Sequence, residues 1–371
     1  MKKFRIMIWG ILCLALLFAT ACGQEKKTDV VTTEEPATEN EETTRAFLEN
    51  RVAACEITGY KTYEGEHASM FLKEGDRIAV ITPSAIASEE QVNATVEGLK
   101  AWGYEPVEGK HVRDKTRTLE DCRDDLQWAL TDPDIKAIFC VRGGYAASEV
   151  MDIMPMEMIA DAHKLIIGYS DITIYHSAWS TAGIPSIHAS MSGTFTGLPE
   201  ACVEAEEKIL RGELPAYRCE SSEFCKEGSA EGILIGGNLT TQISTLQTAY
   251  DCTRTDQPYI LVLEVIEETI QRQHRFLSIL KHMGVLEKAQ AIVFAELTDT
   301  PADFAASDYD GYSRGGAFTS AEDMICRQFL KDLDIPVAFG FPAGHGDMNY
   351  PLLLGEKVRL NVAGDYYTLE Y

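Results

Sequence analysis

The chain has 371 residues, of which 58 are Asp or Glu and 33 are Lys or Arg, so its formal net charge at pH 7 is -25. This excess of negative charge argues against binding to nucleic acid and against direct adsorption to anionic lipid. With 45% hydrophobic residues, the chain is long enough for one large domain or two moderate ones, each with its own core.

The first residues are typical of an export signal. A basic start precedes an apolar stretch from Ile6 to Ala19, which is too short to span a bilayer comfortably. The small residues before Cys22 resemble a lipobox, in which the chain is cut before the Cys and the Cys carries lipid. We expect residues 1–22 to be a lipoprotein signal peptide with its lipobox Cys22. The alternative is an ordinary secretory signal cut nearby, and both readings predict an exported protein.

Residues 23–72 are rich in Thr and Glu and poor in apolar side chains. Such a composition buries too little surface to offset the entropy of ordering. We therefore expect an acidic disordered tether over residues 23–72, which would hang the folded part of the chain from a membrane surface.

The cysteines show no metal-binding pattern. The chain has 10 Cys, but they form no CxxC motif and no Cys/His pair at zinc spacing, so we predict no structural metal. An exported chain could form disulfides, and Cys219 and Cys225 are the pair nearest in sequence. Cys140 lies in an apolar run and is expected to be a buried thiol.

Residues 73–200 alternate between apolar runs and amphipathic segments. Continuous apolar strands separated by helices indicate a parallel sheet covered on both faces. Because ligands bind beyond the carboxyl ends of such strands, we expect the motifs "TPS", "RGGY", "YSD" and "HAS" to meet at one edge. The expected strands are 77–84, 135–144, 164–170 and 185–190, and the expected helices are 88–103, 119–130, 146–154 and 171–183.

A smaller mixed α/β lobe is expected over residues 231–371, after an acidic segment without clear periodicity that we interpret as an inter-lobe linker over 201–230. The lobe contains the apolar strand "PYILVLEVIEE" and ends in "LLLGEKVRLNV" and "YYTLEY", which suggest a hairpin. Further strands are expected at 289–297 and 335–345, and helices at 273–283 and 321–333.

Ser170 stands where a buried strand turns into a helix. A hydroxyl there is exposed at the top of the sheet, and the N–H of Asp171 could face an oxyanion formed beside it. This is the physics of a nucleophile elbow, although Ile172 occupies the place of the second Gly of G-x-S-x-G. The alternative is that Ser170 is simply a helix N-cap.

Further residues suit catalysis around Ser170. His345 lies between two glycines outside any regular pattern, and Glu264 is a carboxylate in an apolar strand, where it needs a partner such as an imidazole. His188 is a second candidate base, with a buried, hydrogen-bonded His as the other reading. Ser84 is expected to line the pocket or cap the next helix.

The "VRGGY" turn supplies the remaining candidates. Gly143 and Gly144 would let the backbone approach a substrate and present an N–H, unless they form only a tight turn. Arg142 could bind a substrate carboxylate with two hydrogen bonds or form a structural ion pair.

Taken together, "VRGGY", "GYSD", "GGNL", "LVLE" with a Glu four residues on, "R-x-x-R" and "GH" resemble the LD-carboxypeptidase family of serine peptidases, from about residue 73 to the C-terminus. This family includes muropeptide LD-carboxypeptidases and microcin-C immunity peptidases. The resemblance implies Ser170 as nucleophile, Glu264 and His345 as its partners, and the amides of Asp171 and Gly144 as oxyanion donors.

The same resemblance implies a flavodoxin-like N-terminal lobe that carries the nucleophile (73–200), a C-terminal lobe that carries Glu and His, and often a homodimer. The family's aromatic-Arg stretch appears here as "TIQRQHR", and two single residues also depart from the family. Ala146 replaces the last Gly of "RGGYG", and Val265 replaces an Asp that often follows the Glu. Neither change removes a catalytic candidate, but both affect the expected shape of the substrate pocket.

The expected function is therefore an exported serine carboxypeptidase without a cofactor. Facing the cell wall from a lipid anchor, it would remove terminal D-Ala from peptidoglycan tetrapeptide stems. The alternatives are a lipoprotein that binds peptides as solutes and a peptidase that acts on a peptide-like antibiotic. The sequence does not distinguish a lysine stem from a diaminopimelate stem, and it leaves the disulfide pairing and the oligomeric state open.

Overall fold

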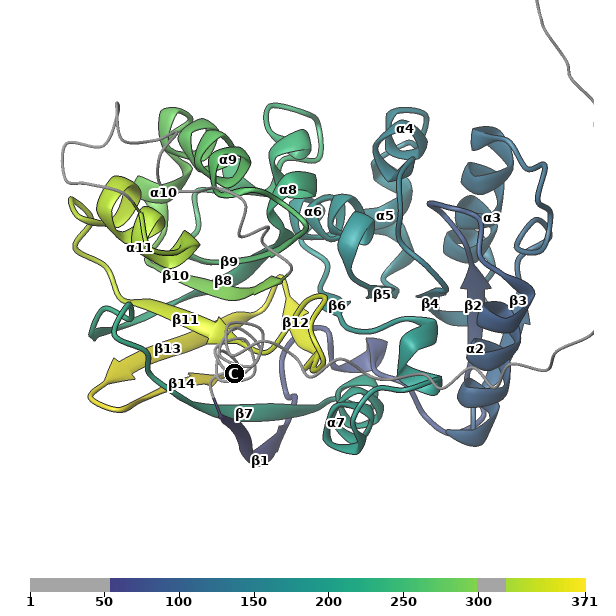
Figure 1. The fold of residues 1–371 in the computed structure, drawn as a ribbon. Coiled ribbons are helices and arrows are strands. Elements are labelled where there is room, and N and C mark those ends of the chain that lie inside the picture. The colour runs from purple at the N-terminus through teal and green to yellow at the C-terminus, as the bar shows by residue number, and fades with distance from the viewer. Residues whose placement is uncertain (1–53, 299–317) are drawn as a thin grey trace, which may run out of the picture. The chain divides into compact units, whose positions relative to one another are not determined.

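The computed structural model describes residues 54–298 and 318–371 (Figure 1). The predicted signal peptide, Cys22 and most of the predicted tether lie outside these residues. Within them, no helix has the length and hydrophobicity needed to cross a bilayer. The described residues belong to one contact unit, Leu48–Tyr371.

The N-terminal sheet has six strands in the order β12-β6-β5-β4-β2-β3. The pairs among β2 to β6 are parallel, and their order 3-2-4-5-6 corresponds to the flavodoxin-like arrangement. The predicted fold of this lobe is thus confirmed. The strands are β2 (Arg77–Ile81), β3 (Glu105–Glu108), β4 (Ile135–Cys140), β5 (Leu165–Gly168), β6 (Ser186–His188) and β12 (Leu352–Leu354).

Five helices connect these parallel strands. Capping boxes fix two of their starts: Ser88 accepts the backbone N–H of Gln91, and Thr118 accepts that of Asp121. A short helix at 157–162 was not predicted from the sequence. The helices are α2 (Glu89–Ala101), α3 (Leu119–Thr131), α4 (Ala147–Asp152), α5 (Glu157–Ala162) and α6 (Thr173–Thr181), with 3₁₀ turns at Ala68–Met70, Ser170–Ile172 and Ser192–Phe195.

The second sheet has eight strands in the order β1-β7-β14-β13-β8-β9-β10-β11. Strands β8 to β11 are parallel neighbours, and the remaining pairs are antiparallel. The strands are β1 (Cys55–Thr62), β7 (Glu213–Glu220), β8 (Gly228–Asn238), β9 (Tyr259–Ile266), β10 (Ala291–Thr298), β11 (Val337–Phe341), β13 (Lys357–Ala363) and β14 (Tyr366–Glu370).

Helices of the second lobe lie along β8, β9 and β10 (Figure 1). Their apolar side chains, such as Leu277 and Met324, share a buried cluster with Leu263 and Phe294 of the strands. The predicted helix 321–333 is shorter than expected, because α11 gives way to a π-helical turn at Cys326–Leu330 and a loop. The helices are α8 (Leu239–Thr245), α9 (Ile270–His282), α10 (Val285–Lys288) and α11 (Ala321–Ile325), with a 3₁₀ turn at Cys252–Arg254.

The segment 201–230, predicted as a linker, is regular structure instead. It contains most of α7 (Glu200–Leu210) and all of β7, which lies between β1 and β14 in the second sheet. Strand β7 was not predicted because its alternating pattern, in which buried Tyr217 and Cys219 are separated by a less buried residue, extends over only a few residues. The second sheet therefore takes more of the chain than the expected lobe boundaries gave it.

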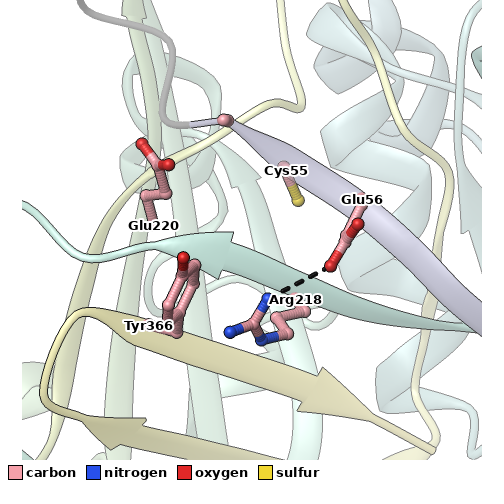
Figure 2. A pocket seen from close by; sticks show the side chains of 6 residues that line it. Cys55, Glu56, Arg218, Glu220 and Tyr366 are labelled. Carbon is pink, nitrogen blue, oxygen red and sulfur yellow. Dashed lines mark hydrogen bonds and ion pairs between the residues drawn. The ribbon is translucent and has the colours of Figure 1, made fainter.

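The end of the predicted tether is also ordered, so the boundary at residue 72 was wrong. Strand β1 pairs with β7, and a disulfide joins Cys55 to Cys219. Glu56 forms an ion pair with Arg218, whose guanidinium lies 3.4 Å from the centroid of the Tyr366 ring (Figure 2). Cys219 thus pairs with Cys55 rather than with Cys225, its nearest neighbour in sequence, and Cys225 is a free thiol. Cys140 is buried as expected.

One short strand connects the two sheets. After β11 the chain leaves the second sheet, and β12 pairs antiparallel with β6 at the edge of the N-terminal sheet. The sequence reading placed 352–354 in a C-terminal hairpin, but the hairpin is formed by β13 and β14 alone. Because β12 belongs to the other sheet, the loop between β11 and β12 is carried over the carboxyl end of β5.

Candidate active site

The carboxyl ends of the parallel strands meet as expected. The N–H of Ala85, after β2, donates to the carbonyl of Gly143, after β4, at 3.2 Å. A Cβ atom added to Gly143 would lie 3.0 Å from the Cβ of Ser170, after β5. Gly143 therefore leaves the space that Ser170 needs, because any larger residue would press on it.

Ser170 has a strained backbone. Its φ of 65° is left-handed, a conformation that costs a non-glycine residue about 1–3 kcal/mol and that accumulates at functional sites. Its side chain caps no helix: the 3₁₀ turn Ser170–Ile172 has Tyr169 at its N-cap position, and α6 has Ile172 there. The N-cap interpretation of Ser170 is thus wrong. Its hydroxyl is turned toward the loop between β11 and β12 instead.

That loop brings His345 to Ser170. The Nε2 atom of His345 lies 3.1 Å from Ser170 Oγ, and its Nδ1 atom lies 2.9 Å from Glu264 Oε2. With the ring proton on Nδ1, the imidazole donates to the Glu264 carboxylate and accepts the Ser170 hydroxyl proton. This is the geometry of a nucleophile, a base and an orienting carboxylate.

Glu264 is 1% exposed near the end of β9. A buried carboxylate is costly without a partner, and the imidazole of His345 supplies one. Gly344, with φ of 133°, passes close over it, since a Cβ added there would lie 3.0 Å from the Cβ of Glu264. The Gly344 N–H donates to Asn349 Oδ1 at 3.0 Å, and Asn349 Nδ2 donates to Ser190 Oγ at 3.0 Å. The His345 loop is therefore tied to both lobes.

The Asp171 carboxylate has a structural role. It accepts the Ser84 hydroxyl at 2.5 Å and the Ala147 N–H at 3.1 Å. Burial raises the pKa of Asp171, while these two hydrogen bonds lower it. Asp171 thereby ties the loops after β2 and β4 to the turn that holds Ser170, and Ser84 lines this turn rather than capping α2. The backbone nitrogen of Asp171 would lie 3.3 Å from a Cβ on Gly143, so it is close to the "RGG" turn.

The rest of the "VRGGY" turn is equally confined. A Cβ on Gly144, with φ of 130°, would lie 2.3 Å from the Cβ of Ala85. Ala146 keeps a left-handed φ of 103° at the position where the family commonly has Gly. Arg142 is exposed, forms no ion pair with any described residue, and donates from Nη1 to the Ile86 carbonyl at 3.0 Å. The structural ion pair considered for Arg142 is thus not formed within this part of the chain.

His188 is the last residue of β6 and forms no hydrogen bond to Ser170. It is 2% exposed, and neither ring nitrogen has a hydrogen-bonding partner among the described residues, so the expected hydrogen-bonded His was wrong. Burial lowers the pKa of His188 to about 3, with further lowering from His176 and His345. Its ring centroid is 6.0 Å from that of Tyr169, whose own ring centroid is 4.8 Å from that of His345.

Sequence reasoning missed two buried acids near the site. Glu206 of α7 accepts the Thr194 hydroxyl at 2.8 Å, and burial raises its pKa well above the usual range. Glu296 of β10 lies against the loop of His345. Glu296 had a recognisable signal, a lone carboxylate in the apolar run "AIVFAEL", whereas Glu206 stands in a helix rich in Glu. Among residues 54–298 and 318–371, no group of three or more His, Cys, Asp or Glu is arranged to hold a metal ion.

Comparisons with known proteins agree with the motifs. The family model described as the LD-carboxypeptidase N-terminal domain matches residues 78–189, and that described as the LD-carboxypeptidase C-terminal domain matches residues 231–360. A putative carboxypeptidase of Synechocystis is 30% identical over 81% of this chain and 95% of its own length. A murein tetrapeptide carboxypeptidase of Pseudomonas aeruginosa is 27% identical over 74% of this chain and 89% of its own length.

Solved structures agree as well. The crystal structure of a muramoyltetrapeptide carboxypeptidase from Oxalobacter formigenes is similar with a TM-score of 0.67 at 26% identity, covering 79% of this chain and 97% of that protein. A microcin C7 self-immunity protein shares the fold, with a TM-score of 0.67 at 23% identity over 81% of this chain and 97% of that protein. The family predicted from the motifs is thereby confirmed.

Proposed function

Because this chain belongs to the LD-carboxypeptidase family and is a serine-type carboxypeptidase, we propose that it removes terminal D-Ala from peptidoglycan tetrapeptide stems. The observation that carries the proposal is the pair of contacts that joins Ser170 to His345 and His345 to Glu264. The names of the relatives support the substrate class, since one is named a murein tetrapeptide carboxypeptidase and another a probable murein peptide carboxypeptidase.

In the proposed reaction, Ser170 Oγ attacks the carbonyl carbon of the L-residue while His345 Nε2 takes its proton. His345 then gives this proton to the amine of the departing D-amino acid, and an acyl-enzyme remains on Ser170. Water, deprotonated by His345, hydrolyses the ester and restores the hydroxyl. Glu264 holds the tautomer that this sequence needs, and no step requires a cofactor.

The oxyanion would be stabilised by two backbone donors, the N–H groups of Asp171 and Gly144. Gly143 supports this assignment, because its missing side chain leaves room between the "RGG" turn and Ser170. One such donor typically contributes about 3–4 kcal/mol to the transition state.

Arg142 is our candidate for binding the terminal carboxylate of the substrate. It stands next to Gly143, and its exposed guanidinium makes one hydrogen bond within the described part of the chain, to the Ile86 carbonyl. The remaining N–H groups are available for a bidentate contact with a carboxylate.

Export supports the choice among substrates. The signal-like N-terminus would place the enzyme outside the cytoplasmic membrane, anchored by lipid on Cys22 and facing the cell wall. Peptidoglycan stems are found there. A solute-binding lipoprotein would not require Ser170, His345 and Glu264 to be in contact, so that contact favours the enzyme.

The direct test incubates the full chain, purified in detergent micelles, with a disaccharide tetrapeptide and follows the products by mass spectrometry. We expect release of D-Ala by the wild type and none above background by Ser170→Ala. Tight binding without turnover by the wild type would favour the solute-binding protein. Turnover of a peptide-like antibiotic but not of the muropeptide would favour the third alternative.

A further inference from the structure

The loop that carries His345 rests on two carboxylates from neighbouring strands. Gly344 lies over Glu264 of β9, and Gly346 lies over Glu296 of β10. A Cβ added to Gly346 would be only 1.9 Å from Glu296 Oε2. The two glycines that flank His345 are thus explained by two acids, of which the proposed mechanism uses only one.

Glu296 is buried in this position. It is 8% exposed, and no described side chain is hydrogen-bonded to its carboxyl oxygens. Its backbone N–H donates to the carbonyl of Ala343, at the start of the loop, at 3.4 Å. The carboxyl group therefore faces the loop backbone at Gly346.

The charged and titratable groups around Glu296 come from three elements. Glu264 belongs to β9, His345 and Asp347 belong to the loop, and Cys202 belongs to α7. The pKa of Glu296 is raised to about 7, mainly by burial and also by the charges of Glu264 and Asp347, against the opposing effects of the Gly346 N–H and His345. Glu296 thus changes its charge in the neutral pH range.

We propose that Glu296 is a positioning residue, whose carboxyl group seats the loop at Gly346 and whose negative charge stabilises the imidazolium that forms on His345 during catalysis. The proposal rests on the proposed function. The proton that leaves Ser170 still goes to His345 Nε2 and then to the leaving amine. Glu296 neither gives nor takes a proton in this step and acts only through its field and the loop backbone.

The charge makes a specific prediction about pH. Below neutral pH Glu296 is protonated and contributes only its contact with Gly346. Above neutral pH it is ionised, and its attraction for the imidazolium accelerates the step in which that ion forms. A neutral amide at this position keeps the shape and an acceptor for the Gly346 N–H, but it never gains the charge.

The experiment compares kcat on the disaccharide tetrapeptide for wild type and Glu296→Gln at pH 6 and pH 8.5. We expect the two kcat values to agree within roughly twofold at pH 6 and the variant to be slower by roughly tenfold at pH 8.5. The difference appears only at the higher pH because Glu296 of the wild type is ionised there and the amide is not.

Asp125→Asn is the matched control. Asp125 is a buried carboxyl with a pKa raised by burial, in the other lobe, and it accepts the His111 N–H. Its variant should show the same ratio to wild type at both pH values.

A second measurement does not need turnover. A buried carboxyl whose pKa is raised from its unfolded value makes the folded state less stable as pH rises from about 4.5 to about 7. The Tm of Glu296→Gln relative to wild type should therefore increase between pH 5 and pH 8.

Equal kcat ratios at both pH values, or a Tm difference independent of pH, would overturn the role of Glu296. A wild type that releases no D-Ala would instead overturn the proposed function, and the Tm comparison would still stand.

Discussion

His345 Nε2 lies 3.1 Å from Ser170 Oγ, although 175 positions separate the two residues in the sequence. The contact depends on β12, which follows β11 of the second sheet along the chain but pairs with β6 of the first sheet. The loop before β12 is thereby fixed at the edge where Ser170 stands. The site is assembled by strand exchange between the lobes and needs no closing movement to bring its three side chains together.

Replacing Glu264 by Gln should reduce activity while the fold is kept. The amide side chain would be isosteric with the carboxylate, but it could donate to Nδ1 of His345 and favour the tautomer that cannot accept the Ser170 proton. We expect kcat to fall by roughly 10³–10⁴-fold, with KM changed little. Steady-state kinetics on the disaccharide tetrapeptide measures this. A fall of less than about tenfold would show that Glu264 does not orient the base.

Gly143→Ala tests the close approach of the "RGG" turn to Ser170. The new methyl group would lie 3.0 Å from Ser170 Cβ and 3.3 Å from Ser170 Oγ, and moving the hydroxyl spoils the distance to His345. We expect kcat to fall by roughly 10²-fold or more. Gly197→Ala is the control, because Gly197 is exposed and a Cβ there meets nothing within 4 Å. Similar kcat values for the two variants would contradict the proposed crowding.

The N-terminal lobe could be predicted because short stretches of its sequence indicate each strand and turn. Each apolar run is followed by a turn motif, and parallel strands bring their carboxyl ends to one edge. The meeting of Ser84, Gly143 and Ser170 follows from that rule alone. The carboxylate of Glu264 could also be recognised, since a charge in an apolar strand needs a partner.

The remainder depends on pairings that no local pattern encodes. The three residues of β12 look like part of the hairpin that follows them, and only their register with β6 shows otherwise. The ordering of β1 comes from its pairing with β7 and from the disulfide to Cys219, 164 positions away. Glu296 carried the same signal as Glu264, but its partner is the backbone of Gly346, which offers no side chain to look for.

Acidification should destabilise the protein through its buried histidines. Burial lowers the pKa of His176 to about 4 and that of His188 to about 3. The unfolded chain takes up protons on both near pH 6.5, and the folded chain does not, so stability falls as pH decreases from about 6.5 toward 4. Each group contributes up to about 1.4 kcal/mol per pH unit.

His188→Leu isolates this effect. The His188 nitrogens have no described partner, so an apolar side chain sacrifices no hydrogen bond there. The variant should lose less stability than wild type between pH 7 and pH 5, as measured by urea unfolding at each pH. An equal loss in both proteins would mean that His188 is protonated in the folded state.

The lipid anchor can be tested in cells. If Cys22 carries lipid, Cys22→Ala should move the protein from the membrane fraction to a soluble or secreted fraction, without changing the activity of the purified chain. Immunoblotting of the fractions, together with mass spectrometry of the N-terminal peptide, measures both. An unmodified Cys22 in the wild type would favour the ordinary secretory signal.

The disulfide between Cys55 and Cys219 should make stability depend on redox conditions. It closes a loop of 164 positions, and cross-links of long loops typically stabilise by about 2–5 kcal/mol because they restrict the unfolded chain. We expect the Cys55→Ser, Cys219→Ser double variant to unfold at lower urea concentration than wild type, and dithiothreitol to lower the midpoint of wild type to that of the variant. The variant itself should not respond to dithiothreitol, because the other described cysteines are free thiols.

Activity below the unfolding transition should be the same in both proteins, since β1 and β7 supply none of the side chains around Ser170. A wild-type midpoint that ignores the reductant, with the thiols shown to be reduced, would mean that the pairing of β1 with β7 holds the strand without the cross-link.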